Sequence, residues 1–274
     1  MRTTSIARPR TFRGVTLVAA FMAAFALLLG AAGSASADAG GGLTAAQRSA
    51  ADQLISIFEN STTTIQYAYA ENLGDGRGVT AGRAGFTTSD GDALQVIQAY
   101  TAQVPDNPLA QFVPVLQNAG AGLDDASYIA AWKQAATDPI FCAVQDDQVN
   151  TRYFNPAMAD ADQLGLTTAL ARAELYDASI QHGNGSDADG LPALIARTNA
   201  QVGTPATAGE QAWLNAFFQV RIADLQNPAN AATAAEWAGS VDRVNALARI
   251  AATGNYDLTG PFQVTAFGST YTVQ

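Results

Sequence analysis

The chain has 274 residues, with 14 basic residues, 24 acidic ones and a formal net charge of −10. It contains one lysine, Lys133. Because a phosphate backbone is bound by clusters of Lys and Arg, we expect no nucleic-acid partner. Its one Cys and one His, Cys142 and His182, exclude an internal disulfide and a conventional Cys/His zinc site.

The first 37 residues are typical of a secretory signal peptide. Four arginines precede or border an apolar stretch over Val15–Leu29, and Ala35-Ser36-Ala37 provides an A-x-A exit. No second long apolar run follows, so we expect a secreted, extracellular protein whose mature form does not span a membrane. Removing residues 1–37 leaves ten basic residues against 24 acidic ones, a net charge of −14. Such a chain attracts cationic ligands, although acidity also keeps secreted proteins soluble.

A helix is predicted to begin at Thr44. The sequence Thr44-Ala45-Ala46-Gln47 fits a capping box, and apolar residues recur at helical spacing through Leu54 and Phe58. Glu59 then lies at the C-terminal end of this helix, where the macrodipole disfavours a negative charge. That position suits a carboxyl group that must donate a proton.

Two extended segments are predicted next, over 63–70 and 79–87, with a glycine-rich turn over 72–78 between them. The glycines allow positive φ, so Asp75 is expected on an exposed loop, although a Gly-Asp-Gly tip can also serve turn geometry alone. Glu59 and Asp75 thus come from different local structures. Glycosidic hydrolysis needs two such groups, one that protonates the leaving oxygen and one that activates water or attacks the sugar.

Helical periodicity dominates from residue 89 onwards. Asp138-Pro139 predicts the end of one helix and the start of the next. Asn155-Pro156 predicts the start of a long helix, which Gly165 interrupts at most gently before His182-Gly183. Two more helices and a C-terminal strand are expected over 209–224, 231–252 and 262–273.

Three polar features outside the paired carboxylates are each expected to have a structural role and not a catalytic one. Cys142 has apolar neighbours and is expected to be a small buried hydrophobe, with a reactive thiol as the alternative. His182, near a helix end, is expected to have a structural, hydrogen-bonding role. The cluster from Asn184 to Gly190 is predicted to be a flexible polar loop, with cation binding as the alternative, because it lacks the terminal Glu of a calcium loop.

The candidate acids lie within a longer pattern. It comprises Glu59-Asn60-Ser61, Tyr67-Ala68-Tyr69, Gly74-Asp75-Gly76-Arg77-Gly78, Thr80, Gly85-Phe86 and Asp92. It continues through Tyr153–Ala157, Tyr176–Ala178, Leu214-Asn215, Arg243-Val244 and Gly254-Asn255. This pattern resembles the chitosanases of glycoside hydrolase family 46 over nearly the whole mature chain. The departures are a shorter interval between Glu59 and Tyr67, Val79 in place of an aromatic residue, and Arg83-Ala84 in place of an aliphatic pair.

The resemblance implies a mainly α (α+β) fold that is bilobal and lysozyme-like, with a small β-sheet or hairpin beside the cleft. We expect residues 38–274 to form a single bilobal catalytic domain that is monomeric. No metal or organic cofactor is expected.

The resemblance also implies the activity, which is endo-hydrolysis of β-1,4 bonds between the glucosamine units of chitosan or chito-oligosaccharides, with inversion. By resemblance, Glu59 is the general acid, Asp75 is the general base and Thr80 holds the attacking water. The expected substrate-binding residues are Arg77, Asp92 and Tyr69. Arg243 is expected to pair with Glu59, and Asp177 and Arg221 are expected to extend that network of charges.

Two other functions fit the same residues. One is a lysozyme-like hydrolase of peptidoglycan or another amino-sugar polymer, and the other is a non-catalytic carbohydrate-binding protein. For Asp177, Arg221 and Arg243, an ordinary interior salt-bridge network is also open.

Overall fold

The computed structural model describes residues 42–74, 76–231 and 233–274. The signal peptide predicted over 1–37 and the candidate base Asp75 lie outside these residues. Within this part of the chain, no helix combines the length and the apolar composition that crossing a membrane requires.

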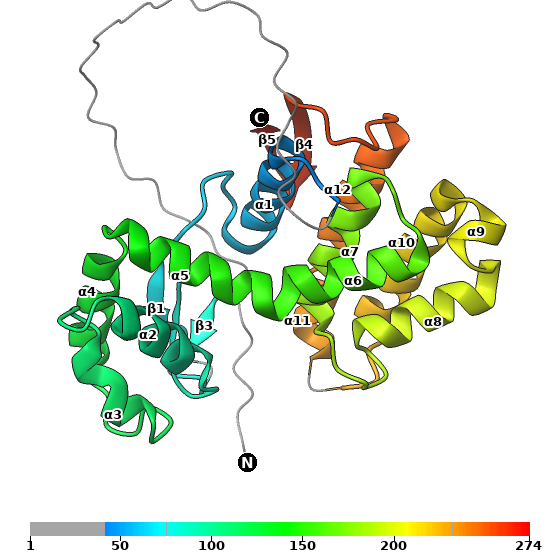
Figure 1. The fold of residues 1–274 in the computed structure, drawn as a ribbon. Coiled ribbons are helices and arrows are strands. Elements are labelled where there is room, and N and C mark those ends of the chain that lie inside the picture. Colours follow the sequence, from blue (N-terminus) through cyan, green and yellow to red (C-terminus); the bar gives the residue numbers. More distant parts are fainter. Residues whose placement is uncertain (1–41, 75, 232) are drawn as a thin grey trace, which may run out of the picture.

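Two lobes are joined by a long helix that runs across the molecule (Figure 1). The smaller lobe contains β1 (Ala70–Asn72), β2 (Val79–Ala81), β3 (Phe86–Thr87), α2 (Asp92–Gln103), η1 (Ala110–Phe112), α3 (Val113–Leu116) and α4 (Asp125–Ala135). The larger lobe contains α1 (Ala45–Asn60), α7 (Ala169–His182), α8 (Leu191–Val202), α9 (Pro205–Ala208), α10 (Glu210–Gln226), α11 (Ala234–Ala238), α12 (Val241–Ala252), β4 (Phe262–Ala266) and β5 (Ser269–Val273). The predicted class, mainly helical with a small antiparallel sheet, is confirmed.

The joining helix is built from α5 (Pro139–Val149), the π-helical turn η2 (Asn150–Phe154) and α6 (Asn155–Leu164). The predicted helix start at Asn155-Pro156 is the start of α6, but the π-helical turn before it makes α6 continuous with α5, which was not predicted. Proline has no N–H to donate within the helix. The carbonyl of Arg152, four residues before Pro156, instead accepts a hydrogen bond from Asn184 Nδ2 at 2.8 Å.

The same helix ends where the sequence predicted only a gentle interruption. Gly165 adopts a left-handed conformation with φ 71° and caps α6. Thr168 then starts α7, with its side chain accepting from the Ala171 N–H. The expected single helix up to His182 is therefore two helices, because a left-handed glycine closes the final turn of the first one.

The capping box at Thr44 is present. The Thr44 Oγ1 accepts from the Gln47 N–H at 3.2 Å, and the Gln47 side chain accepts from the Thr44 N–H at 2.9 Å. The buried face of α1 includes Leu54, Ile57 and Phe58. This helix packs against α7 and β5, which fixes the position of its C-terminal end.

The three-stranded sheet is smaller than predicted. Its order is β1-β2-β3 and both pairs are antiparallel. The segment 63–69 is not a strand, because the carbonyl of Tyr67 accepts from two side chains, Trp132 Nε1 at 2.9 Å and Gln145 Nε2 at 3.1 Å. The predicted strand over 79–87 is divided into β2 and β3 by a turn.

That turn begins at Gly82, which has φ 74°. A Cβ at this position would lie 2.4 Å from Gln145 Oε1 and 2.8 Å from Trp132. Both the backbone conformation and the close approach therefore require glycine.

Two predicted C-terminal elements are also divided. The helix expected over 231–252 breaks at Gly239-Ser240 into α11 and α12. The expected strand over 262–273 is a hairpin, in which β4 and β5 pair through a turn at Phe267-Gly268 with φ values of 51° and 77°. Positive φ at both turn residues matches the twist of a two-residue hairpin.

Cys142 is only partly buried, so the prediction of a small buried hydrophobe was wrong. On α5 its neighbours Phe141 and Val144 face the core instead. The thiol lies 3.5 Å from the carbonyl oxygen of Ala136, and burial raises its pKa.

Candidate active site

Glu59 lies in the last turn of α1, and Ser61 ends this helix in the left-handed conformation with φ 55°. The Glu59 side chain is 32% exposed. Arg243 Nη2, on α12, donates to Glu59 Oε1 at 2.8 Å. The carboxylate is thus accessible on one side and held by a cation on the other.

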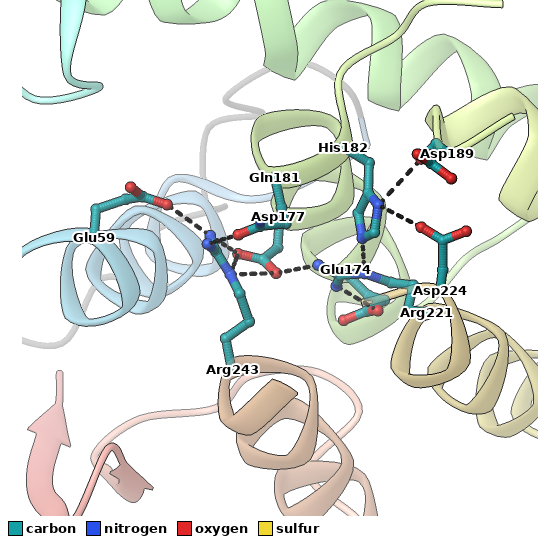
Figure 2. A network of polar contacts seen from close by, with 9 residues as sticks. All are labelled: Glu59, Glu174, Asp177, Gln181, His182, Asp189, Arg221, Asp224 and Arg243. Carbon is teal, nitrogen blue, oxygen red and sulfur yellow. Dashed lines mark hydrogen bonds and ion pairs between the residues drawn. The ribbon is translucent and has the colours of Figure 1, made fainter. Parts of the chain in front are cut away.

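Arg243 also connects Glu59 to the interior of the larger lobe. Its Nη2 donates to Asp177 Oδ1 at 2.7 Å, and its Nε lies 3.1 and 3.2 Å from the two Asp177 oxygens. Arg221 completes the network by donating to Asp177 Oδ2 at 2.9 Å and to Glu174 Oε1 at 2.7 Å. Figure 2 shows this chain of charges leading from Glu59 between α7, α10 and α12. The structure therefore brings Asp177, Arg221 and Arg243 together behind Glu59.

Burial and charge act differently on the two carboxylates of α7. For Asp177 burial favours the neutral form, but the guanidinium groups of Arg243 and Arg221 outweigh it and hold the pKa below its usual range. For Glu174 burial dominates over Arg221 and raises the pKa to about 7. Its Oε2 has no hydrogen-bond partner among the described residues. Glu174 is therefore the interior acid of this network that can change protonation near neutral pH.

His182 lies at the C-terminal end of α7 and extends the network. Burial lowers its pKa, so the ring is neutral near pH 7. Arg221 Nε lies 3.4 Å from Nε2, which makes Nε2 an acceptor, while Nδ1 lies 3.1 Å from the carbonyl oxygen of Asp189 and 3.4 Å from Asp224 Oδ2. This arrangement agrees with a structural role.

The polar segment 184–190 has a buried anchor. Asp189 is 5% exposed and accepts from the backbone N–H groups of Ala229 at 2.7 Å and Asn230 at 2.9 Å. Its carboxylate thus joins this segment to the loop after α10.

Thr80 lies in the middle of β2 and is buried. The register places Glu71 and Thr87 directly opposite it on the two neighbouring strands, so these three side chains project from one face of the sheet. The Thr80 Oγ1 has no hydrogen-bond partner among the described residues. Since buried hydroxyls are normally hydrogen-bonded, Thr80 is a strong candidate to bind a group that enters the site.

Arg77 is exposed on the loop that precedes β2. Its carbonyl accepts from the Ser89 N–H at 3.3 Å. The next residue, Gly78, has φ 74°, and a Cβ there would lie 2.2 Å from Thr88 Oγ1. The chain after Asp75 is therefore anchored next to the end of β3, although Asp75 itself lies outside the described residues.

Asp92 begins α2 beside the sheet. Its Oδ1 accepts from the N–H groups of Thr87 at 2.7 Å and Ala93 at 2.8 Å. Burial nevertheless raises the pKa of Asp92. Tyr69 lies at the other end of the sheet, where its hydroxyl donates to Glu71 Oε2 at 3.2 Å.

Tyr153 is partly buried in the joining helix and was not among the predicted site residues. It belongs to η2, the π-helical turn of the joining helix. Burial raises its pKa, and the charges of Asp92 and Glu59 both add to this effect. The phenol therefore lies within electrostatic reach of the carboxylates on both lobes.

A comparison with protein-family models matches residues 53–262 to "Glycosyl hydrolase family 46". The chain belongs to glycosyl hydrolase family 46. It is therefore a glycoside hydrolase, as the resemblance implied.

Relatives agree with this assignment over most of their length. A chitosanase from Bacillus subtilis (strain 168) is 50% identical over 230 residues, covering 81% of this chain and 83% of the relative. The structure of a mutant chitosanase from Bacillus subtilis MY002 complexed with six GlcN has a TM-score of 0.78 and 46% identity, covering 85% of this chain and 100% of that one. The Gynuella sunshinyii GH46 chitosanase complexed with chitotetraose has a TM-score of 0.77 and 47% identity, covering 85% and 99%.

Sequence reasoning for this family 46 member missed two residues, Glu174 and Tyr153. Glu174 had a usable signal, because it lies three residues before Asp177 and therefore on the same side of α7. Tyr153 had no sequence signal beyond its place in the matched pattern, because the π-helical turn that orients it was not predictable.

Proposed function

We propose that this chain is a secreted endo-acting chitosanase that cleaves β-1,4 bonds between glucosamine units with inversion. The observation that carries the proposal is Glu59, which is partly exposed at the end of α1 and bonded to Arg243. The family assignment and the relatives named as chitosanases support the substrate.

In the proposed reaction, Glu59 donates its proton to the glycosidic oxygen as the bond between that oxygen and the anomeric carbon breaks. Asp75 accepts a proton from a water molecule whose oxygen attacks the anomeric carbon from the opposite face. The Thr80 hydroxyl holds this water. Glu59 is left ionised and Asp75 protonated, and exchange with solvent restores both. Inverting enzymes typically separate the two carboxyl groups by about 6.5 to 9.5 Å.

The substrate preference is assigned to charge. Chitosan carries an ammonium group on each glucosamine, and the chain without residues 1–37 has a net charge of −14. We assign Asp92 to binding an ammonium group, and Arg77 and Tyr69 to binding sugar hydroxyls. A cationic partner would favour the ionised form of Asp92 and so offset the burial that raises its pKa.

The proposal includes the form in which the protein acts. Residues 1–37 direct secretion and are removed, and residues 38–274 act as a monomeric catalytic domain. Detection of the mature N-terminus near Asp38 in culture medium, with sedimentation of a single-chain species, checks this part.

The central experiment measures new reducing ends on chitosan, acetylated chitin and bacterial cell wall. The variants are Glu59→Gln and Asp75→Asn, with Asp106→Asn as a control that removes an exposed carboxylate on the loop after α2. We expect wild type and the control to cleave chitosan, and both site variants to lose at least about 10²-fold in kcat.

Each other result selects a different function. Cleavage of cell wall alone indicates a peptidoglycan hydrolase, and binding of chitosan without new reducing ends indicates a carbohydrate-binding protein. Proton NMR of the first products tests the stereochemistry, because inversion of a β-linked substrate gives the α anomer. A β anomer as first product contradicts the inverting mechanism.

A further inference from the structure

A second buried network involves Arg83 and reaches α1 at Asp52, about two helical turns before Glu59. Arg83 is located in the turn between β2 and β3 and is 6% exposed. Its backbone N–H donates to Gln145 Oε1 at 3.1 Å, which fixes the turn against α5. A charged side chain is rarely buried to this degree unless it is paired.

Arg83 is paired with two carboxylates from different elements. Its Nη2 donates to Asp52 Oδ1 on α1 at 2.8 Å, and its Nη1 contacts Asp146 on α5. We call Arg83, Asp52 and Asp146 the Arg83 brace. It joins the sheet turn of the smaller lobe to the first helix of the larger lobe and to the joining helix.

Other side chains hold both carboxylates in place. Asp52 accepts from the Tyr176 hydroxyl at 3.1 Å and from Arg48 Nε at 2.9 Å. Asp146 accepts from the Tyr67 hydroxyl at 2.8 Å. The charges of Asp52 and Asp146 raise the pKa of Arg83 although burial opposes this, so the guanidinium is permanently charged. The geometry of the brace is thus set by directional bonds from α1, α5, α7 and the segment before β1.

The location of the brace matters more than its net contribution to stability. A buried ion pair is often no more stabilising than well-packed apolar side chains of the same volume. However, Asp52 precedes Glu59 by seven residues on α1, about 10 Å along the helix axis, and Arg83 follows Thr80 by three residues. Both partners therefore belong to the backbone elements that carry the proposed acid and the proposed water-binding hydroxyl.

We propose that Arg83 is a positioning residue, which holds α1 against the β2–β3 turn and so sets the separation between Glu59 and Thr80. This inference rests on the proposed function of those two residues. Without the brace, both side chains remain present, but α1 and β2 lose a directional connection. A misplacement of about 1 Å can reduce the rate of a positioned reaction by about 10²-fold.

The experiment compares Arg83→Met, Arg83→Lys and Asp52→Asn with Arg172→Met. The control removes an arginine that is also buried and pairs with Asp162 at 2.7 Å, at the contact between α6 and α7. For each variant, kcat and KM on a defined glucosamine oligomer and the melting temperature are measured.

We expect Arg83→Met to lower kcat by about 10- to 100-fold with KM changed by less than about threefold. Arg83→Lys should retain more of kcat, and Arg83→Met combined with Asp52→Asn should lose little more than the single variants, because one interaction is removed in each case. Arg172→Met should lower the melting temperature and leave kcat near wild type.

A kcat within twofold of wild type in folded Arg83→Met overturns the inference. If Arg83→Met does not fold, Arg83→Lys and Asp52→Asn decide the matter, since unchanged kcat in both contradicts a positioning role. Wild-type protein without activity on glucosamine oligomers overturns the proposed function instead, so the two failures are distinguishable.

Discussion

At the scale of single residues, Glu59 depends on an arginine that it shares with the protein interior. Arg243 donates from the same nitrogen to Glu59 and to Asp177. We infer that this shared guanidinium fixes the position of the Glu59 carboxyl group at the end of α1.

Replacement of Arg243 tests this hypothesis. In Arg243→Ala, Glu59 loses its anchor, so kcat on chitosan should fall by about 10-fold or more. Arg249→Ala is the matched control, since Arg249 is a half-exposed arginine on the same helix that pairs with Asp242. A kcat within twofold of wild type in folded Arg243→Ala contradicts this positioning role.

Glu174 should make stability depend on pH. Its pKa rises from 4.5 to about 7 on folding, so between these values the folded protein binds more protons than the unfolded chain. The Glu174 contribution to the free energy of unfolding should therefore decrease as pH rises from about 4.5 to about 7, by about 1 to 3 kcal/mol.

Urea unfolding of wild type and Glu174→Gln at several pH values measures this effect. The difference between the two free energies of unfolding should shift in favour of Glu174→Gln as pH rises through this range. A difference that is independent of pH indicates that Glu174 does not titrate there.

At the scale of elements, sequence reasoning located helices better than their ends. The capping box at Thr44 and the start of α5 at Pro139 were predictable, because they depend on nearby residues only. The strand over 63–70 was not, because the Tyr67 carbonyl is taken by Trp132 and Gln145, which are distant in the sequence. The start of α6 at Asn155 was predictable, but its continuity with α5 was not, because the hydrogen bond to the Arg152 carbonyl comes from the distant Asn184.

The turn at Gly82 offers a direct test of how α4 and α5 shape the sheet. Gly82→Ala should lower the free energy of unfolding by about 2 to 4 kcal/mol, because its Cβ would meet Gln145 and Trp132 in addition to the backbone strain. Gly268→Ala is the control, with φ 77° and no atom within 4 Å of a Cβ, and should cost only about 1 kcal/mol. Equal losses in chemical denaturation would show that the contacts with α5 and α4 are unimportant.

At the scale of the whole molecule, acidity should govern the encounter with substrate. Attraction between a polyanionic protein and a polycationic polymer is screened by salt, with a Debye length of about 10 Å at 0.1 M. The kcat/KM on chitosan should therefore fall severalfold between about 0.05 and 0.5 M NaCl, mainly through KM. The kcat at saturating substrate serves as the internal control, and a kcat/KM independent of salt contradicts electrostatic attraction.

The fold class of the whole molecule was predictable because the sequence resembles the family over nearly all of the mature chain. The family comparison confirms that class. The candidate site was predictable only as a set of residues. Glu59, Arg243 and Asp177 are far apart in the sequence, and their contact depends on how α1, α7 and α12 pack. The Arg83 brace shows the same limit, because nothing near Arg83 in the sequence indicates that its partners lie on α1 and α5.

The extra-wide turn at 150–154 has a consequence for how the halves of the protein are oriented. An α-helix rotates by about 100° per residue, so accommodating one additional residue in a single turn resets the angular phase of everything that follows. Deleting one residue there would rotate α6 relative to α5. The larger lobe, which carries Glu59, would then no longer face the sheet of the smaller lobe in the same orientation. The length of this one turn therefore determines whether the two halves meet as complementary surfaces.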